Sequence, residues 1–136
     1  LKVHTHKTNN VISKKVDIYL VDAYGMTKSF YKTCDNIFLG GSLIGHGGQN
    51  PLEATRYGCN IIHGPNVSNF REIYNFLTKI KVSYKISNQI EMLAILKKLL
   101  SKNDKSKKIQ KKLNLTGQKI LHKTYNKINL IVRNEI

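Results

Sequence analysis

The residues best suited to do chemistry in this sequence lie in one glycine-rich segment. Seven of the nine glycines fall between Gly40 and Gly64, and the densest part runs from Gly40 to Asn50. Because glycine has no Cβ, such a segment lets backbone N–H groups approach an anion closely. A helix that follows adds free N–H groups and the positive end of its dipole. The segment therefore predicts a binding site for a phosphate or a similar anionic group.

Three polar side chains in or after this segment could complete such a site. The Ser42 hydroxyl could contact a phosphate oxygen, and the Glu53 carboxylate could accept hydrogen bonds from a ribose diol. Asn50, Pro51 and Glu53 also have the spacing of a helix start, in which Asn50 and Glu53 form a capping box without any ligand. Both interpretations stay open, as does one in which the glycines only form tight turns. The spacing fits neither the P-loop nor the dinucleotide-binding fingerprint.

Alternating strands and helices are predicted to position this segment. Short apolar runs predict strands at 16–21, 37–39, 60–62 and 82–86, the first of them buried. Helices are predicted over 24–32, from Asn50 to Gly58, from Asn69 to about Ile80, and from Ser87 or Asn88 to Leu100. This alternation implies an α/β fold with a parallel sheet covered by helices. Ligands bind beyond the carboxyl ends of such strands, and the 40–50 loop falls there.

Apolar spacing predicts which helix faces pack inward. These positions are Phe70, Ile73, Leu77 and Ile80 in the third helix, and Ile90, Leu93, Leu96 and Leu100 in the fourth. Asn69 and Glu72 repeat the capping spacing seen at Asn50 and Glu53.

The C-terminal third of the chain is basic. Eleven lysines lie between Lys97 and Lys127, with Asp104 as the only acid in that stretch. After a polar break at 101–106, the spacing of apolar residues predicts a long amphipathic helix. This helix forms a basic extension over about 104–133. Its apolar positions are Ile109, Leu113, Ile120, Leu121 and Ile128. Gly117 costs about 1 kcal/mol in a helix relative to alanine, so a kink could occur there.

Length and composition fit one domain over residues 1–136. The net charge of +15 favours anionic partners such as nucleic acid, acidic lipid or a phosphorylated substrate. Cys34 and Cys59 are too few for a disulfide framework, so we expect both to be buried in a reduced protein. No apolar run approaches the roughly 18 residues of a membrane span, and the N-terminus lacks the order of a signal peptide. Since the sequence does not begin with Met, we expect a piece of a longer protein.

Other functional classes find less support. His4 and His6 are two apart, but no cysteine or acid is near them in the sequence, so neither a metal site nor a cofactor is predicted. His63 is expected only to pack. Nucleic acid is not expected as a partner because the basic stretch holds one aromatic residue, Tyr125, and no base-stacking pattern. An anionic membrane surface or a neighbouring domain remains an alternative partner for the basic helix.

The sequence around the glycines closely resembles one enzyme family. The resemblance rests on Phe38-Leu39-Gly40-Gly41-Ser42-Leu43, His46-Gly47-Gly48-Gln49-Asn50-Pro51-Leu52-Glu53, Gly64-Pro65 and Asn69-Phe70. These strings resemble the 3-deoxy-D-manno-octulosonic acid (Kdo) transferases, glycosyltransferases that build the inner core of lipopolysaccharide. The segment from Val21 to Gly25 is similar to the family's sequence before the glycine loop, and the likeness runs from about Asp17 to Leu77.

The resemblance implies a Rossmann-like domain of a B-type (GT-B) glycosyltransferase, in which two such domains face each other across a cleft. The C-terminal domain of the family binds the donor CMP-Kdo, and this chain resembles the later part of that domain. The N-terminal domain holds the lipid A precursor, the membrane anchor and the general base. We therefore expect that this chain alone cannot transfer sugar. The resemblance implies an inverting, metal-independent reaction at the cytoplasmic face of the bacterial inner membrane. The part of the enzyme that this chain represents is expected to be soluble. The last helix is expected to cross back to the first domain.

Site residues follow from the resemblance by position. Gly41 and Ser42 would contact the donor phosphate, and His46, Gly47 and Gly48 would shape the loop around it. Asn50 and Glu53 would face the ribose and phosphate, and Gly64, Pro65, Asn69 and Phe70 would form the opposite wall. The sequence departs from the family at Met26, where a glutamate is usual, and at Asn66, where a histidine is usual. Because a methionine cannot accept a hydrogen bond as a carboxylate does, the contact at Met26 is in doubt.

Overall fold

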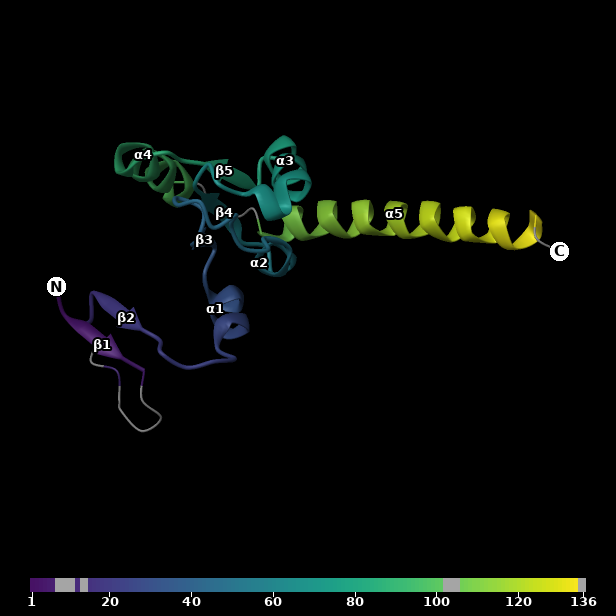
Figure 1. Cartoon of the computed structure of the whole chain (residues 1–136). Helices are drawn as coiled ribbons and strands as arrows, with labels where there is room; N and C mark the ends of the chain where they lie inside the picture. The colour runs from purple at the N-terminus through teal and green to yellow at the C-terminus, as the bar shows by residue number, and fades with distance from the viewer. Residues whose placement is uncertain (7–11, 13–14, 102–105, 135–136) are drawn as a thin grey trace.

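The computed structural model describes residues 1–6, 12, 15–101 and 106–134, and only the backbone of 106–112, 120 and 132–134. Its elements are β1 (Val3–Thr5), β2 (Ile18–Leu20), α1 (Thr27–Thr33), β3 (Asn36–Leu39), α2 (Leu52–Arg56), β4 (Asn60–His63), a 3-10 turn η1 (Ser68–Phe70), α3 (Arg71–Lys79), β5 (Ser83–Lys85), α4 (Gln89–Leu100) and α5 (Ser106–Asn134). Figure 1 labels these elements along the chain.

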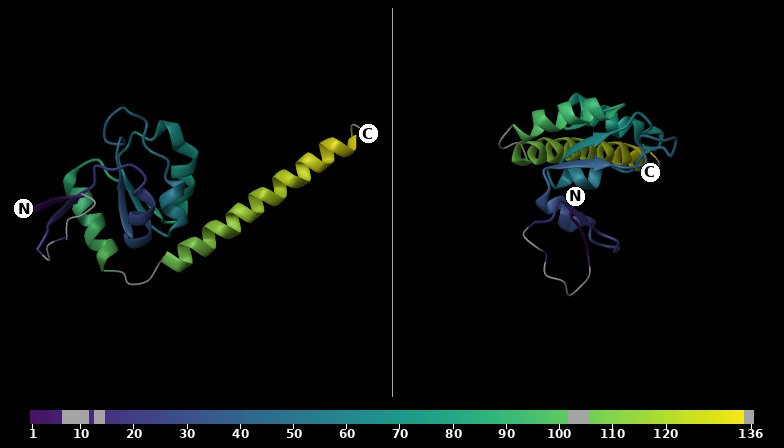
Figure 2. Two further views of the ribbon diagram at one scale, coloured as in Figure 1. Left: turned by 90° about the horizontal axis from the view of Figure 1, so that it is seen from below. Right: turned by 90° about the vertical axis from the view of Figure 1, so that its left-hand side faces the viewer.

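A three-stranded parallel sheet, β3-β4-β5, forms the centre of the fold. Its middle strand β4 is buried along its whole length, and its side chains alternate between two cores. Ile61 packs with α2 and α3 residues on one face, whereas Ile62 packs with α4 residues on the other. The left-hand view of Figure 2 shows the sheet lying between α4 and α3. The predicted α/β fold with a parallel sheet and flanking helices is therefore confirmed.

The strand predicted at 16–21 forms as β2, but its predicted burial is wrong. β2 pairs in parallel with β1 in a separate two-stranded sheet, which lies apart from the central sheet in Figure 1. Ile18 is 43% exposed and Leu20 is 51% exposed. Apolar periodicity identifies a strand, but it does not specify which partner the strand will find. Here the partner is the short segment around His4, whose ring stacks on Tyr19 of β2.

Helix α4 begins as predicted but presents a different face to the core. The Asn88 Oδ1 atom accepts a hydrogen bond from the Glu91 N–H at 2.9 Å, so the predicted cap is present. Of the four positions predicted to face inward, Leu96 packs against the core, but Ile90, Leu93 and Leu100 are exposed; the helix instead packs through Met92, Ile95, Leu96 and Leu99. Apolar residues lie on more than one side of this helix, so contacts with the sheet selected the face.

The cap predicted at Asn69 is wrong. The turn η1 precedes α3, which starts at Arg71 with no side-chain cap. The Nδ2 atom of the Asn69 side chain instead donates to the His46 carbonyl oxygen at 3.4 Å. At α2, the Asn50 Oδ1 atom accepts from the Leu52 N–H at 3.0 Å. Within the described part of the chain the Glu53 side chain has no hydrogen bond, so the reciprocal half of that capping box is absent.

Helix α5 is continuous over 29 residues and passes through Gly117 without a break. Its first half contacts α2, and Leu113 packs with α3 residues, while its second half extends away from the domain (Figures 1 and 2). Leu121 and Ile128, two of its predicted apolar positions, are exposed. In the described ranges, no helix is both long enough and apolar enough to cross a membrane.

The two cysteines lie in different environments. Cys59 is buried as expected, and its thiol donates to the carbonyl oxygen of Cys34 at 3.1 Å. Burial, with the nearby Cys34 and Asp35, raises the pKa of the Cys59 thiol to about 11. Cys34 is exposed, which contradicts the expectation that both cysteines are core residues.

Candidate functional site

The glycine-rich loop lies at the carboxyl edge of the central sheet, as predicted. It follows Leu39, the last residue of β3, and leads into α2. Since β3, β4 and β5 are parallel, the turn after His63 and the end of β5 at Lys85 lie at the same edge. Two connections from different parts of the sequence, residues 40–51 and 64–70, are thereby brought together.

Ser42 holds these two connections together from inside the protein. Its side chain is fully buried, and its hydroxyl donates to the Leu39 carbonyl oxygen at 2.6 Å. The Ser42 hydroxyl oxygen also accepts a hydrogen bond from the Gly64 N–H at 2.8 Å. The Asn66 N–H donates to the Ser42 carbonyl oxygen at 2.9 Å. The Ser42 hydroxyl, predicted to contact a phosphate, is thus engaged in the interior instead.

Gly64 is required by this close approach. A Cβ on Gly64 would lie 2.2 Å from the carbonyl oxygen of Ser42, which is a backbone atom that cannot turn aside. Its place in the predicted site is therefore explained by packing between two turns. Pro65, the next residue, is exposed and lines the cleft described below.

Gly47 makes a second close contact between the same two connections. Its φ of +91° is in the left-handed region, and a Cβ on Gly47 would lie 2.5 Å from the side-chain Nδ2 atom of Asn69. The Asn69 N–H donates to the Gly47 carbonyl oxygen at 3.2 Å. Gly41 and Gly48 also have positive φ, and the Gly48 N–H donates to the Gly41 carbonyl oxygen at 3.0 Å. The structure thus brings Gly41, Gly47, Gly48 and Asn69 together with His46.

Several N–H groups of the loop remain available to a ligand. Two are engaged internally, that of Gly48 and that of His46, which donates to the Ile44 carbonyl oxygen at 2.7 Å. The N–H groups of Leu43, Ile44 and Gly45 have no acceptor among the described residues, and all three residues are exposed. These three consecutive residues form the exposed end of the loop.

Asn50 lies just before α2 and Glu53 in its first turn. Both are exposed, and neither lines the cleft that the other loop residues border. The pKa of Tyr31 on α1 is raised by burial and, to a smaller extent, by the negative charge of Glu53. Glu53 is therefore near enough to α1 to act on it electrostatically.

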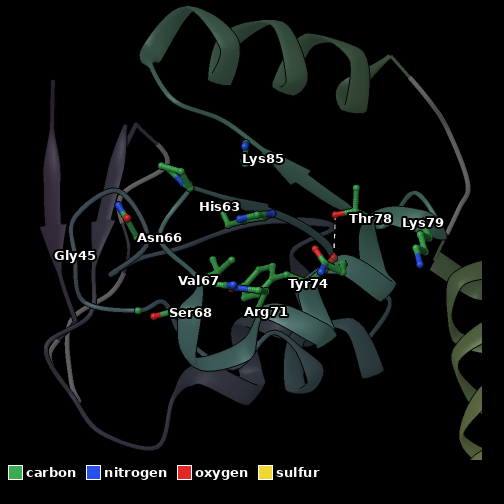
Figure 3. A pocket seen from close by; sticks show the side chains of 13 residues that line it. Gly45, His63, Asn66, Val67, Ser68, Arg71, Tyr74, Thr78, Lys79 and Lys85 are labelled. Carbon is green, nitrogen blue, oxygen red and sulfur yellow. Dashed lines mark hydrogen bonds between the residues drawn. The ribbon is translucent and has the colours of Figure 1, made fainter.

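A cleft of about 800 Å³ opens between the loop, α3 and the end of β5 (Figure 3). Of the predicted site residues, Gly47 and Pro65 line it. Sequence reasoning missed the other members, which are Gly45, His63, Asn66, Val67, Ser68, Arg71, Tyr74, Asn75, Thr78, Lys79 and Lys85. The signal that could have found them is the polar face of α3, where Arg71, Asn75 and Thr78 recur at helical spacing.

The cleft has a positive charge. Arg71, Lys79 and Lys85 line it, and its lining includes no acidic side chain. All three cations are exposed, and none forms an ion pair with the part of the chain that the structure describes. Lined by three cations with no counter-charge, such a cleft raises the local concentration of anions.

His63 is the buried polar residue of this cleft. It is 3% exposed, and its ring lies 4.3 Å from the Tyr74 ring, measured between centroids. Its Nδ1 atom lies 2.7 Å from the Gly64 carbonyl oxygen, so Nδ1 carries the hydrogen. The Nε2 atom then has only a lone pair, and no described residue is its hydrogen-bond partner. Burial lowers the pKa of His63, and the positive charge of Lys85 lowers it further. The hydrogen bond to Gly64 raises this pKa and so opposes part of the effect.

Metal ligands do not gather in the described residues, where no three His, Cys, Asp or Glu side chains come together. His4 and His6 both contact the Tyr19 ring.

A parallel sheet with helices on both faces and a glycine loop at its carboxyl edge defines a Rossmann-like domain. No family model matches the chain. The chain is similar to the 3-deoxy-D-manno-octulosonic acid transferase of Aquifex aeolicus, with 30% identity over 111 residues that cover 82% of this chain and 31% of the relative. It is also similar to the 3-deoxy-D-manno-octulosonic acid transferase of Haemophilus influenzae, with 31% identity over 86 residues that cover 63% of this chain and 20% of the relative. The enzyme of Rickettsia typhi is 35% identical over 88 residues, 65% of this chain and 19% of the relative.

The fold is also similar to that of a solved structure. It is the C-terminal CMP-Kdo binding domain of WaaA from Acinetobacter baumannii, with a TM-score of 0.71 and 22% identity over 81% of this chain and 57% of that chain. The curated relatives confirm the resemblance to Kdo transferases found in the sequence. The chain spans less than a third of the length of the curated relatives named above.

Proposed function

We propose that this chain is the donor-binding part of a Kdo transferase and that its glycine loop holds CMP-Kdo. The observation that carries the proposal is the run of N–H groups at the exposed residues Leu43, Ile44 and Gly45, which have no acceptor among the described residues, next to a cleft lined by three cations that form no ion pair there. Such amides bind a phosphate without a metal ion. The similarity to Kdo transferases supports CMP-Kdo as the ligand.

In this proposal the loop residues have two kinds of role. The amides of residues 43–45 receive the phosphate of CMP. Gly41, His46, Gly47, Gly48 and Asn69 hold the loop in shape, and Ser42 with Gly64 fixes it to the sheet. Asn50 and Glu53 are exposed at the start of α2, where the ribose could reach them. Pro65 contributes to the opposite wall.

The proposed contribution to the reaction is stabilisation of the leaving group. When the sugar is transferred, the bond between Kdo and the CMP phosphate breaks and negative charge grows on the phosphate. Preorganised N–H donors stabilise that charge, and losing one such donor typically costs about 3–4 kcal/mol of barrier. We propose an inverting, metal-independent transfer in which the general base and the lipid A precursor are supplied from outside this chain. The chain alone is then inactive as a transferase.

We further propose that α5 helps to hold the enzyme at an anionic membrane surface, on the cytoplasmic side of the inner membrane. Leu121, Tyr125 and Ile128 are exposed on the distal half of α5. Lys119, Lys123 and Lys127 recur at four-residue spacing on the opposite side of the same helix. An apolar face opposite a lysine-bearing polar face is the pattern of amphipathic helices that lie in the headgroup region of anionic bilayers.

The experiment that tests donor binding is an amide chemical-shift titration of this chain with CMP, using AMP as the control. Shifts at Leu43, Ile44 and Gly45 that saturate with CMP at lower concentration than with AMP are expected. Equal responses to the two nucleotides would show binding of any phosphate. No response at millimolar CMP would contradict the proposal.

A further inference from the structure

The cationic side chains of the cleft are not explained by the phosphate that the proposed function places on the loop. Arg71, Lys79 and Lys85 lie on α3 and at the end of β5, outside the 43–45 amides. Gly45 nevertheless lines the cleft, so the loop amides and these cations border one continuous space. A ligand that fills both must carry negative charge at two points.

We propose that this cleft is a carboxylate subsite for the sugar acid of the donor, with the Arg71 guanidinium as its main ligand and Lys85 as its second. This inference rests on the proposed function, since it takes the phosphate of the same donor to be bound by the loop. An octulosonic acid linked to CMP has two anionic groups, the phosphate and the sugar carboxylate. The planar guanidinium of arginine binds a carboxylate through two parallel hydrogen bonds.

The placement of Arg71 fits this role. It is the first residue of α3, it is exposed, and it has no ion pair or hydrogen bond with other described residues. Figure 3 shows its side chain with those of Val67 and Tyr74 along the wall of the cleft, and Lys85 on the opposite side beyond His63. The cleft therefore has cations on both sides and no acidic side chain that would compete for them.

His63 is a second, independent sign of a ligand. It is buried at the base of the cleft, and its Nε2 atom has no hydrogen-bond partner among the described residues. The hydrogen bond between Nδ1 and the Gly64 carbonyl makes Nε2 an acceptor. Because a buried acceptor without a donor is unfavourable, we expect the His63 ring to turn Nε2 toward the cleft and gain a donor when the site is filled. A polyhydroxylated sugar acid provides hydroxyl donors close to its carboxylate, directly or through an ordered water.

The subsite predicts how the donor is distinguished from other nucleotides. CMP itself engages only the loop, whereas CMP-Kdo engages the loop and the cations of the cleft. A nucleotide linked to a neutral sugar lacks the carboxylate and leaves Arg71 and Lys85 without a partner. Arg71 is therefore a specificity-determining residue for the acidic sugar.

The test compares the affinities of CMP and CMP-Kdo, measured by calorimetry, for the wild-type chain, Arg71→Gln and Lys28→Gln. Lys28 is an exposed lysine on α1 that does not line the cleft, so it is the matched control for loss of one positive charge. We expect the wild type and the control to bind CMP-Kdo more tightly than CMP. In Arg71→Gln, CMP-Kdo affinity should fall by about tenfold, as for loss of a charged hydrogen bond, with CMP affinity unchanged.

Three results would overturn the subsite. If Arg71→Gln weakens CMP and CMP-Kdo equally, Arg71 acts on the phosphate. If wild type binds CMP but gains nothing from the sugar acid, the subsite is wrong while the proposed function stands. If wild type binds neither ligand, the proposed function fails and this inference fails with it. Circular dichroism of each variant establishes that the fold is retained.

Discussion

The hydroxyl of Ser42 accepts a hydrogen bond from the N–H of Gly64 at 2.8 Å, although 22 residues separate them in the sequence. The same hydroxyl donates to the Leu39 carbonyl oxygen at the end of β3. One buried side chain therefore connects the turn after β3 with the turn after β4. The two walls of the proposed donor site are held in place by this connection.

Removing that hydroxyl should destabilise the fold. Ser42→Ala leaves the buried Gly64 N–H without its acceptor, and we expect a loss of about 1–3 kcal/mol in the free energy of unfolding. Chemical denaturation measures the loss. Thr33→Ala on α1 is the matched control, since the Thr33 hydroxyl is exposed and bonds only locally, and it should cost less. A Ser42→Ala chain of unchanged stability that no longer binds CMP would instead assign the hydroxyl to the ligand.

The loop conformation should depend on Gly47. Gly47→Ala places a Cβ 2.5 Å from the Asn69 side chain and requires a positive φ from alanine. We expect the loop to shift and CMP affinity to fall by about tenfold or more, which corresponds to about 1–3 kcal/mol of backbone strain. The measurement is a CMP titration by calorimetry. In Gly40→Ala, where a Cβ meets nothing within 4 Å, CMP affinity should stay near the wild-type value. Equal effects of the two substitutions would contradict the role given to Gly47.

His63 should make stability sensitive to acid. Because burial lowers its pKa below the ordinary value of 6.5, the unfolded chain binds a proton there before the folded chain does. The contribution of neutral His63 to the free energy of unfolding is complete above pH 6.5, and it is lost as the pH falls through the lower pKa of the folded state. His63→Asn keeps a donor toward the Gly64 carbonyl and removes the titration. Its free energy of unfolding should therefore decrease less than that of wild type as the pH falls below 6.5. Parallel pH profiles would show that His63 is not the cause.

Helix α5 should bind anionic vesicles through its lysines. Changing Lys119, Lys123 and Lys127 together to glutamine should weaken binding to vesicles that contain phosphatidylglycerol, by about 1 kcal/mol for each lysine near the surface. Cosedimentation with vesicles measures this binding. Neutral phosphatidylcholine vesicles and a Lys28/Lys32 double substitution on α1 are the controls. Equal binding of wild type and triple variant would contradict a membrane role for α5, and tight salt-sensitive binding to duplex DNA would favour a nucleic-acid partner.

The strands of the central sheet could be predicted because each is a short apolar run bounded by turn residues. The loop at the sheet edge followed from the same pattern, since glycines between a strand and a helix can lie only at the carboxyl end of that strand. The face of α4 could not be predicted in this way. Ile90 and Met92 are both apolar, and only contact with the cluster of Ile62 in β4 and Ile86 just after β5 determines that Met92 packs inward.

The candidate site was only partly visible in the sequence. Gly47 and Pro65 were found because their residue types are rare and clustered, and the structure places both at the cleft. Arg71 and Lys85 were missed because cations are common in this chain, and nothing local distinguishes them from lysines on solvated surfaces. Ser42 was found, but its role was misread, because a sequence does not show whether a hydroxyl faces solvent or the neighbouring turn.

The most direct test of the central claim is the crystal structure of this chain with CMP bound. We predict phosphate oxygens within hydrogen-bonding distance of the N–H groups of Leu43, Ile44 and Gly45, with the phosphate facing the cleft that Arg71 lines. A phosphate bound elsewhere on the protein, with these three amides still without an acceptor, would contradict the account.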